Sequence, residues 1–196
     1  MITIGLTGSI GMGKSTAALM LKSMGCAVHD ADACVRKALM PNGKAFEQVA
    51  LAFPKAWDKK NHIINKEKLA RLIFNDPVQK QRLESLLHPI VQQEQAQLIR
   101  AQKRMGRRIT ILDIPLLFET GADRRVDITA VVSAPYFIQR QRVLSRPHMS
   151  EEKFHAILNT QMDDQKKCAL ANFIIPTGLG KAITCQHLTA MLKALR

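Results

Sequence analysis

Residues 8–15 read Gly8-Ser9-Ile10-Gly11-Met12-Gly13-Lys14-Ser15, and this stretch matches the phosphate-binding loop pattern G-x-x-x-x-G-K-[ST]. Its glycines allow successive backbone N–H groups to turn toward phosphate oxygens, because no Cβ atom stands in the way. In this pattern Lys14 brings a positive charge to the β- and γ-phosphates, and Ser15 offers a hydroxyl to Mg²⁺. The stretch therefore predicts a P-loop that binds the phosphates of a nucleotide.

The residues on either side of the P-loop predict the strand and the helix that this motif requires. Residues 2–7 form an apolar run that is typical of a buried strand. After the loop, apolar side chains recur at helical spacing, at Ala17, Met20, Leu21 and Met24. We expect this helix to present its positive N-terminal end to the same phosphates. The alternative, an ordinary glycine-rich turn, does not require this arrangement.

Composition and charge bound the class of protein. The chain has 196 residues, enough for one domain or one domain with an insert. The net charge of +13 favours a polyanionic partner (nucleotide phosphates, nucleic acid or an acidic membrane), although a solvated basic surface explains it equally well. The four cysteines form no C-x-x-C pair, so we expect a reduced, cytoplasmic protein. No apolar run is as long as a membrane span, and we expect no membrane partner.

Strand patterns alternate with helical patterns along the chain. Strands are predicted at residues 2–7, 27–29, 109–113, 128–132 and 173–175, and helices at 135–145, 150–169 and 181–195. This alternation predicts an α/β three-layer fold, in which a mainly parallel five-stranded sheet carries helices on both faces. We expect residues 1–196 to form a single domain of this kind.

The segment between the second and third predicted strands is too long for a simple crossover. Residues 44–104 show a helical pattern with no convincing strand. Asn75-Asp76-Pro77 predicts a helix start, and Pro89 is expected to kink or divide the following helix near His88. We interpret residues 35–104 as an inserted, helical substrate-binding subdomain.

Acidic residues stand at the ends of two predicted strands. In an α/β sheet the ligand lies at the carboxyl ends of the strands, so Asp30, Asp32 and Asp113 are expected near the P-loop. One aspartate of the first pair is suited to accept a proton from an attacking hydroxyl, while the other organises Mg²⁺ or the loop. Asp113 is placed as a carboxylate that holds Mg²⁺. The alternative for each is a capping role at the end of a strand or the start of a helix.

Basic residues recur on one predicted helix near residue 140. Gln139, Arg142 and Arg146 are spaced i, i+3, i+7 and are expected to share a face. Two guanidiniums that close over ATP stabilise charge on the transferring phosphoryl group. A solvated basic face is the alternative. His88 is open between packing and ligand binding, because a lone histidine on an apolar helix face is usually a packing residue.

Further segments follow the P-loop in the order and at the spacing of one enzyme family. They are Gly5-Leu6-Thr7-Gly8, Asp30-Ala31-Asp32 with Arg36, Leu87-His88-Pro89, Asp113-Ile114-Pro115-Leu116-Leu117-Phe118-Glu119, Gln139-x-x-Arg142 with Arg146, and Gln161. With these segments the chain resembles the dephospho-CoA kinases from residue 2 to about residue 165. The P-loop by itself indicates only a superfamily, whereas the segment at 113–119 is much more particular.

This resemblance implies a P-loop kinase fold with a CoA-binding subdomain at 35–104 and a lid at 136–165. It implies transfer of the γ-phosphoryl group of ATP to the 3′-hydroxyl of dephospho-CoA, the last step of coenzyme A synthesis. Asp32 is implied to be the general base, and Arg142 and Arg146 to be lid arginines. The acceptor site is implied to include Arg36, His88, Asp32 and Asp113. The implied ATP and Mg²⁺ site comprises Gly8, Gly11, Met12, Gly13, Lys14, Ser15 and Thr16, with Ser15 and Asp113 as metal ligands.

The match weakens toward the C-terminus, and other functions remain open. Family members usually carry an Ala-Asp-x-x-Ile-x-Asn-like stretch that touches adenine, whereas Asn172 and Thr177 stand at its Asp and Asn positions here. One alternative is a kinase for another small acceptor, such as a nucleoside or nucleotide. The others are a nucleic-acid-binding ATPase and an inactive nucleotide-binding protein. No RNA-binding signature with interleaved aromatic residues occurs, so we expect no nucleic acid partner.

Overall fold

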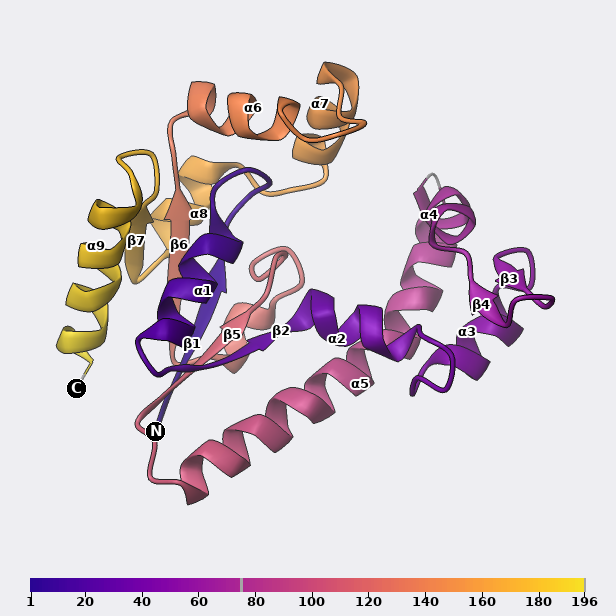
Figure 1. Ribbon diagram of the computed structural model, residues 1–196, viewed down its shortest axis with the longest axis horizontal. Helices are drawn as coiled ribbons and strands as arrows, with labels where there is room; N and C mark the ends of the chain where they lie inside the picture. Colours follow the sequence, from indigo (N-terminus) through magenta and orange to yellow (C-terminus); the bar gives the residue numbers. More distant parts are fainter. Residues whose placement is uncertain (75, 196) are drawn as a thin grey trace. The chain divides into compact units, whose positions relative to one another are not determined.

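The computed structural model describes residues 1–74 and 76–195 (Figure 1). The chain divides into two compact units, of which the first combines Met1–Asp30 with Ile99–Arg196 and the second is Ala31–Leu98. The second unit is therefore inserted between the two segments that build the first. Within the described residues, no helix is long and apolar enough to cross a membrane.

A five-stranded parallel sheet is the framework of the first unit, with the strand order β2-β5-β1-β6-β7. Its strands are β1 (Ile2–Thr7), β2 (Ala27–Asp30), β5 (Ile109–Asp113), β6 (Ile128–Ser133) and β7 (Phe173–Pro176). The predicted α/β fold with a parallel five-stranded sheet is thereby confirmed. Because every strand is parallel, all the carboxyl ends lie along one edge, and the P-loop starts at this edge after β1.

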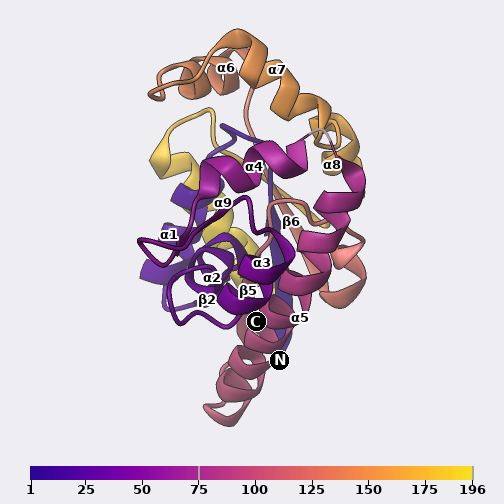
Figure 2. The ribbon, with the colours of Figure 1, turned by 90° about the vertical axis from the view of Figure 1, so that its right-hand side faces the viewer.

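Helices surround this sheet. They are α1 (Lys14–Ser23), α6 (Tyr136–Leu144), α7 (Glu151–Asn159), α8 (Asp164–Leu170) and α9 (Lys181–Ala194), with a 3-10 helix, η1, at Ala122–Arg125. Helices α1 and α9 pack side by side on one face of the sheet (Figure 1). Helices α6 and α7 lie beyond the edge of the sheet from which the P-loop emerges (Figures 1 and 2). Helices α6 and α7 and the P-loop therefore lie at the same end of this unit (Figure 1).

Side chains of the strands alternate between two buried clusters, one on each face. Ile111 of β5 packs with Leu21 of α1 and Leu188 of α9, and each of these three side chains is 0% exposed. Leu112, the next residue of β5, packs with Leu117 in a second cluster. Neighbouring strand residues point to opposite faces of the sheet. Consecutive apolar residues such as Ile111 and Leu112 therefore supply a side chain to the cluster on each face. Full burial of one such side chain contributes about 1.5–3 kcal/mol.

The second unit is mainly helical and has its own core. Its helices are α2 (Ala31–Ala38), α3 (Phe46–Ala52), α4 (Lys66–Phe74) and the larger part of α5 (Pro77–Arg104), and a hairpin joins β3 (Trp57–Asp58) to β4 (Ile63–Ile64). The core contains Phe46, Val49, Phe53, Leu69, Leu83 and Leu87. Helix α5 begins where it was predicted, because the Asp76 side chain accepts hydrogen bonds from the N–H groups of Val78 and Gln79, each at 3.0 Å. Asn75, the first residue of the predicted start, lies outside the described residues.

Two sequence-based expectations about secondary structure were wrong. The hairpin β3–β4 lies in the segment for which no strand was expected, and strands of two residues are too short to show a periodic pattern. The helix predicted at 150–169 is two helices, α7 and α8, because the Asp163 side chain caps a new start by accepting from the N–H groups of Gln165 and Lys166. Of the two effects expected of Pro89, a kink or a division of the helix, the division does not occur, because α5 continues through Pro89 to Arg104.

Candidate active site

The P-loop connects β1 to α1 and contains two residues with left-handed backbone. Gly11 has φ 79° and Gly13 has φ 88°, values that favour glycine. A Cβ atom at Gly11 would lie 2.6 Å from Val143 Cγ2, so α6 packs directly on the loop. Gly13 precedes α1 and gives it no side-chain cap. The first N–H groups of α1 are therefore left to be satisfied by a ligand or by water.

Lys14 and Asp113 form an ion pair at the carboxyl edge of the sheet. The Lys14 Nζ atom donates to Asp113 Oδ1, and the two side chains are 15% and 5% exposed. Lys14 is the first residue of α1, and Asp113 is the last residue of β5, which pairs directly with β1. The fold thus brings together a lysine and a carboxylate that are 99 residues apart. Ser15 and Thr16 follow Lys14 on α1 and are exposed.

Two glutamines hold the peptide groups of Ile10 in the P-loop. The Ile10 N–H donates to Gln161 Oε1 at 3.0 Å, and Gln139 Nε2 donates to the Ile10 carbonyl oxygen at 2.7 Å. Gln139 lies on α6 and is only 3% exposed, and Gln161 lies between α7 and α8. Two residues of the predicted lid are therefore hydrogen-bonded to the P-loop, one on each side of Ile10.

Arg142 contacts the P-loop through a second set of bonds. Its Nη1 atom donates to Thr177 Oγ1 at 3.1 Å and to the Gly11 carbonyl oxygen at 3.4 Å, and its Nη2 atom donates to the Thr177 carbonyl oxygen at 2.7 Å. The Thr177 hydroxyl in turn donates to the Met12 carbonyl oxygen at 2.6 Å. Thr177 therefore joins the P-loop, α6 and the segment after β7.

The predicted face of Gln139, Arg142 and Arg146 is only partly formed. Gln139 and Arg142 both reach the P-loop, as their spacing suggested. Helix α6 ends at Leu144, so Arg146 lies outside it and is exposed. The backbone leaves the helix before position i+7 of the pattern, so helical spacing no longer applies to Arg146. Arg140, on the same helix, instead pairs with Glu151 at the start of α7.

A buried ion pair supports the segment that carries Gln161. Lys167 of α8 is 0% exposed, and its Nζ atom lies 2.9 Å from Glu119 Oε1. The same carboxylate oxygen accepts the Met162 N–H at 2.8 Å. Burial raises the pKa of Glu119, but the bonds from Lys167 and from the Met162 N–H outweigh burial and leave the pKa below its usual value. Glu119 is therefore a charged anchor for the backbone next to Gln161.

A pocket of about 600 Å³ lies beside the P-loop in this unit. Ser9 and Met12 line it from the P-loop, Gln139 lines it from α6, and Gln161 and Asp164 line it from the segments around α8. The Asp164 carboxylate accepts a hydrogen bond from Ser133 Oγ at 2.5 Å, and burial raises its pKa. The Ser9 hydroxyl is buried and has no hydrogen-bond partner among the described residues.

Asp32, Arg36 and His88 belong to the second unit, and all three are exposed there. Asp32 is the second residue of α2, so it is not the N-cap of that helix, and β2 ends only two residues before it. Arg36 lies one turn further along α2. His88 lies on α5 next to Pro89 and points to solvent rather than into the core of this unit. His88 is therefore not a packing residue in the core of this unit.

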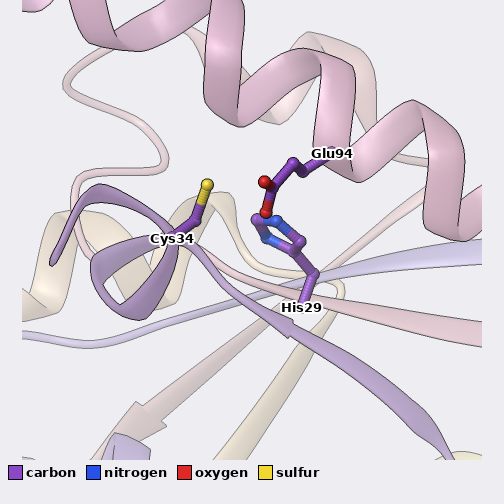
Figure 3. Close-up of side chains that lie close together, drawn as sticks. All are labelled: His29, Cys34 and Glu94. Atoms are coloured by element: carbon purple, nitrogen blue, oxygen red, sulfur yellow. The ribbon is translucent and has the colours of Figure 1, made fainter. Parts of the chain in front are cut away.

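The second unit also contains a buried thiol. Cys34 of α2 and Glu94 of α5 lie near each other in Figure 3, and Lys44 Nζ donates to Glu94 Oε1 at 3.2 Å. Burial raises the pKa of the Cys34 thiol to about 11, and its hydrogen bond to Glu94 adds to this. The pKa of Glu94 is lowered, first by the hydrogen bond from Cys34 and further by Lys44. The thiol is therefore protonated and packs as a neutral group.

Comparison with known proteins decides the family. A family model described as dephospho-CoA kinase matches residues 2–180 of the chain. The chain belongs to the dephospho-CoA kinase family. The dephospho-CoA kinase of Mesorhizobium japonicum is 43% identical over 100% of this chain and 98% of its own length. That of Brucella melitensis is 44% identical over 90% of this chain and 86% of its own.

Solved structures agree with this family. A crystal structure of a Thermus thermophilus protein matches with a TM-score of 0.86 and 34% sequence identity. The match covers 100% of this chain and 98% of the Thermus thermophilus chain. The dephospho-CoA kinase of Campylobacter jejuni has a TM-score of 0.70 and 27% identity over 97% of this chain and 95% of its own. A shikimate kinase from Bacteroides thetaiotaomicron, with a TM-score of 0.53 and 12% identity, shares the fold alone.

Sequence reasoning missed several contacts of this dephospho-CoA kinase family member. Gln139 and Gln161 were part of the family pattern, but nothing in their spacing showed that they hold the two sides of Ile10. Thr177 was noted only as a departure from the pattern, and Lys167 was not noted at all. A lysine in an otherwise amphipathic helix gives no signal that it is fully buried, because its partner Glu119 is 48 residues away in sequence.

Proposed function

We propose that this chain transfers the γ-phosphoryl group of ATP to the 3′-hydroxyl of dephospho-CoA, giving coenzyme A and ADP, in the cytoplasm. Its membership of the dephospho-CoA kinase family supports the acceptor, because its named relatives align over nearly the whole chain. The observation that carries the proposal within the structure is the P-loop lysine, Lys14, at the carboxyl edge of the sheet beside Asp113. Phosphoryl transfer needs a charged, preorganised site of this kind.

The P-loop is proposed to hold the phosphates of ATP. Lys14 exchanges part of its contact with Asp113 for the β- and γ-phosphates, and the uncapped N-terminal turn of α1 offers its N–H groups. The remaining contacts of this site are assigned to Gly8, Gly11, Met12, Gly13, Ser15 and Thr16. Gly11 and Gly13 are required for the backbone itself, since both lie in the left-handed region.

Ser15 and Asp113 are the proposed ligands of Mg²⁺. Magnesium prefers oxygen ligands and keeps several waters, so one exposed hydroxyl and one carboxylate at the sheet edge fit it. The bound ion supplies positive charge to the phosphate oxygens. Asp113 has a second role in this assignment, because it also holds Lys14 in place at the start of α1.

Asp32 is the proposed general base. Its carboxylate is exposed at the start of α2, where β2 has just ended, and it is available to accept the proton of the acceptor hydroxyl. Arg36 and His88 are proposed to bind the acceptor, whose phosphate oxygens accept hydrogen bonds from a guanidinium and from an imidazole N–H. The proposed CoA-binding subdomain, residues 35–104, accordingly contains most of the second unit, Ala31–Leu98.

Arg142 and Arg146 are proposed to act from the lid, residues 136–165. Arg142 is already positioned against the Gly11 and Thr177 carbonyl oxygens, next to the proposed phosphate site. Arg146 is exposed beyond the end of α6 and has the freedom to approach a bound nucleotide. Two arginines near the transferring group stabilise the charge that develops there and exclude water when the lid closes.

The test is the formation of coenzyme A from dephospho-CoA and Mg·ATP by the purified protein, read by mass. We expect a product heavier by one phosphoryl group, in equal amount to ADP. Lys14→Ala is expected to abolish it. ATP binding without phosphorylation of dephospho-CoA contradicts the acceptor assignment, and nucleosides and nucleotides are then the acceptors to assay.

Acceptor binding is tested separately on α2. Arg36→Ala is expected to raise the KM for dephospho-CoA about tenfold with little change in the KM for ATP, in line with a lost charge-assisted hydrogen bond. Lys37→Ala is the matched control, because Lys37 is the neighbouring exposed cation of the same helix. Equal effects of the two substitutions indicate a general charge effect and contradict the assignment of Arg36.

A further inference from the structure

The peptide groups of one P-loop residue, Ile10, are bonded on both sides by the lid region. The N–H donates to Gln161 Oε1 at 3.0 Å, and the carbonyl oxygen accepts from Gln139 Nε2 at 2.7 Å. Gln161 and Gln139 are 22 residues apart in sequence and come from different segments, the α7–α8 linker and α6. Ile10 itself contributes no polar side chain, so these bonds act only on its backbone.

The chemistry of the backbone fixes which end of each glutamine faces Ile10. A backbone N–H only donates, so Gln161 must present its oxygen. A backbone carbonyl only accepts, so Gln139 must present its nitrogen. The two positions therefore have opposite requirements, an acceptor at 161 and a donor at 139.

The orientation of Gln161 is itself held by a buried charge. Glu119 Oε1 accepts the N–H of Met162, the residue after Gln161, at 2.8 Å, and the same oxygen lies 2.9 Å from Lys167 Nζ. The Gln161 N–H donates to the Leu158 carbonyl oxygen at 2.9 Å. The backbone on both sides of the Gln161 side chain is thus fixed before that side chain reaches the P-loop.

We propose that Gln139 and Gln161 are positioning residues that set the orientation of the Ile10 peptide groups and so preform the P-loop for the phosphates of ATP. The loop turns through left-handed backbone at Gly11, the next residue, so the orientation of Ile10 decides where the following N–H groups point. Two peptide groups held by partly buried hydrogen bonds lose little freedom when ATP binds, which favours binding. The proposal rests on the proposed function only in taking ATP as the ligand.

The two glutamines also link the lid to the P-loop. Both belong to residues 136–165, the segment that also carries Arg142. Any movement of α6 or of the α7–α8 linker must carry these bonds with it or break them. ATP binding and lid position are therefore coupled through Ile10, with no contact between the glutamines and the phosphates required.

The experiment measures ATP binding by calorimetry for substitutions that respect or violate the required polarity. Gln161→Leu is expected to raise the Kd for ATP about tenfold, because the Ile10 N–H loses its acceptor. Gln161→Glu keeps an acceptor and is expected to stay within about threefold of the wild type. Gln139→Glu loses the donor and is expected to raise the Kd about tenfold or more. The two glutamate variants add the same charge beside Ile10. A difference between their Kd values for ATP therefore reports whether each position needs a hydrogen-bond donor or an acceptor.

Steady-state kinetics and a control variant separate positioning from general destabilisation. In Gln161→Leu the KM for ATP is expected to rise while the KM for dephospho-CoA stays within about twofold of the wild type. Gln165→Leu is the control, because Gln165 lines the same pocket and its side chain is exposed. Wild-type ATP affinity in Gln161→Leu, or equal losses in the two glutamate variants, overturns the proposal. If the wild type binds ATP but forms no coenzyme A, the proposed function fails, and the order of the Kd values still decides this inference.

Discussion

Lys14 Nζ donates to Asp113 Oδ1, so the P-loop lysine and the last residue of β5 form an ion pair at the carboxyl edge of the sheet. Both side chains are largely shielded from water, at 15% and 5% exposure. Phosphates that bind Lys14 must therefore compete with a carboxylate already beside it. The same carboxylate is the proposed Mg²⁺ ligand, so the metal and the lysine share it.

Replacement of Asp113 separates these two roles. In EDTA, Asp113→Asn is expected to bind ATP at least as tightly as the wild type, because no carboxylate competes for Lys14. Addition of Mg²⁺ is expected to tighten ATP binding by the wild type and to have less effect on the variant. Turnover is expected to fall about 10²-fold or more, as when one preorganised charge of an active site is removed. Calorimetry with and without Mg²⁺ measures this, and an unchanged response to Mg²⁺ removes Asp113 from the metal site.

Asp32→Asn tests the general base. Turnover is expected to fall by about 10² or more while the Kd for ATP is unchanged, because the amide cannot accept the proton of the acceptor hydroxyl. Asp32 is exposed, so the folded structure should tolerate the change. Glu47→Gln, in the first turn of α3, is the matched exposed control. Near-normal turnover of Asp32→Asn in the mass assay refutes the assignment.

Arg142→Lys tests whether the forked guanidinium is needed. A lysine cannot bond Thr177 Oγ1 and the Thr177 carbonyl oxygen from two nitrogens as Arg142 does, at 3.1 and 2.7 Å. We expect kcat/KM for ATP to fall about tenfold or more. Arg140→Lys on the same helix alters only a surface pair with Glu151 and is expected to change kcat/KM by less than about twofold. Similar losses in both variants contradict a specific role for Arg142.

The Glu119–Lys167 pair is expected to stabilise the first unit in a pH-dependent way. Its net effect lowers the pKa of Glu119, so the folded state favours the ionised carboxylate. The contribution of Glu119 is therefore fully present above the ordinary glutamate pKa of 4.5 and is lost as the pH falls through the lower folded value. Urea unfolding should show a stability difference between wild type and Glu119→Gln at about pH 7 that shrinks below about pH 4. A difference that does not change over this range contradicts the shifted pKa.

Removal of Lys167, the cation of this pair, should lower the free energy of unfolding more than removal of a surface cation does. Lys167→Met leaves the partly buried Glu119 carboxylate without its cation and is expected to destabilise the protein by about 3–5 kcal/mol. Lys166→Met, at the exposed neighbouring position, is expected to change stability by less than about 0.5 kcal/mol. Chemical denaturation of the two variants provides the comparison, and equal stabilities argue against a buried pair.

Cys34 should be unreactive in the folded protein. Its pKa of about 11, compared with the usual 9.0, lowers the thiolate fraction near pH 8 about 100-fold, and the side chain is also buried. Iodoacetamide should label Cys34 at least about 100-fold more slowly in the folded than in the urea-unfolded protein. Mass spectrometry of the labelled peptide measures both rates. Equal rates in the two states contradict the buried, protonated thiol.

The P-loop and the strands could be predicted from sequence because their signals are local. The P-loop pattern, with its spaced glycines and final lysine, lies within a short window of sequence. The same holds for the mainly apolar segments 2–7 and 109–113 that predict strands. The break between α7 and α8 was missed: α7 ends at Asn159, and the Asp163 side chain caps the start of α8 four residues later. The short hairpin β3–β4 was missed because two residues carry no period.

Sequence by itself determined the family, the P-loop and the order of strands and helices, since these depend on contiguous or regularly spaced residues. Only the tertiary structure decided that Gln161 bonds Ile10 across 151 residues, that Thr177 bridges Met12 and Arg142, and that Lys167 is fully buried against Glu119. Such contacts join residues far apart in the chain, and their side chains fit many environments. Their partners are therefore set by how the strands, the P-loop and the lid helices pack in space.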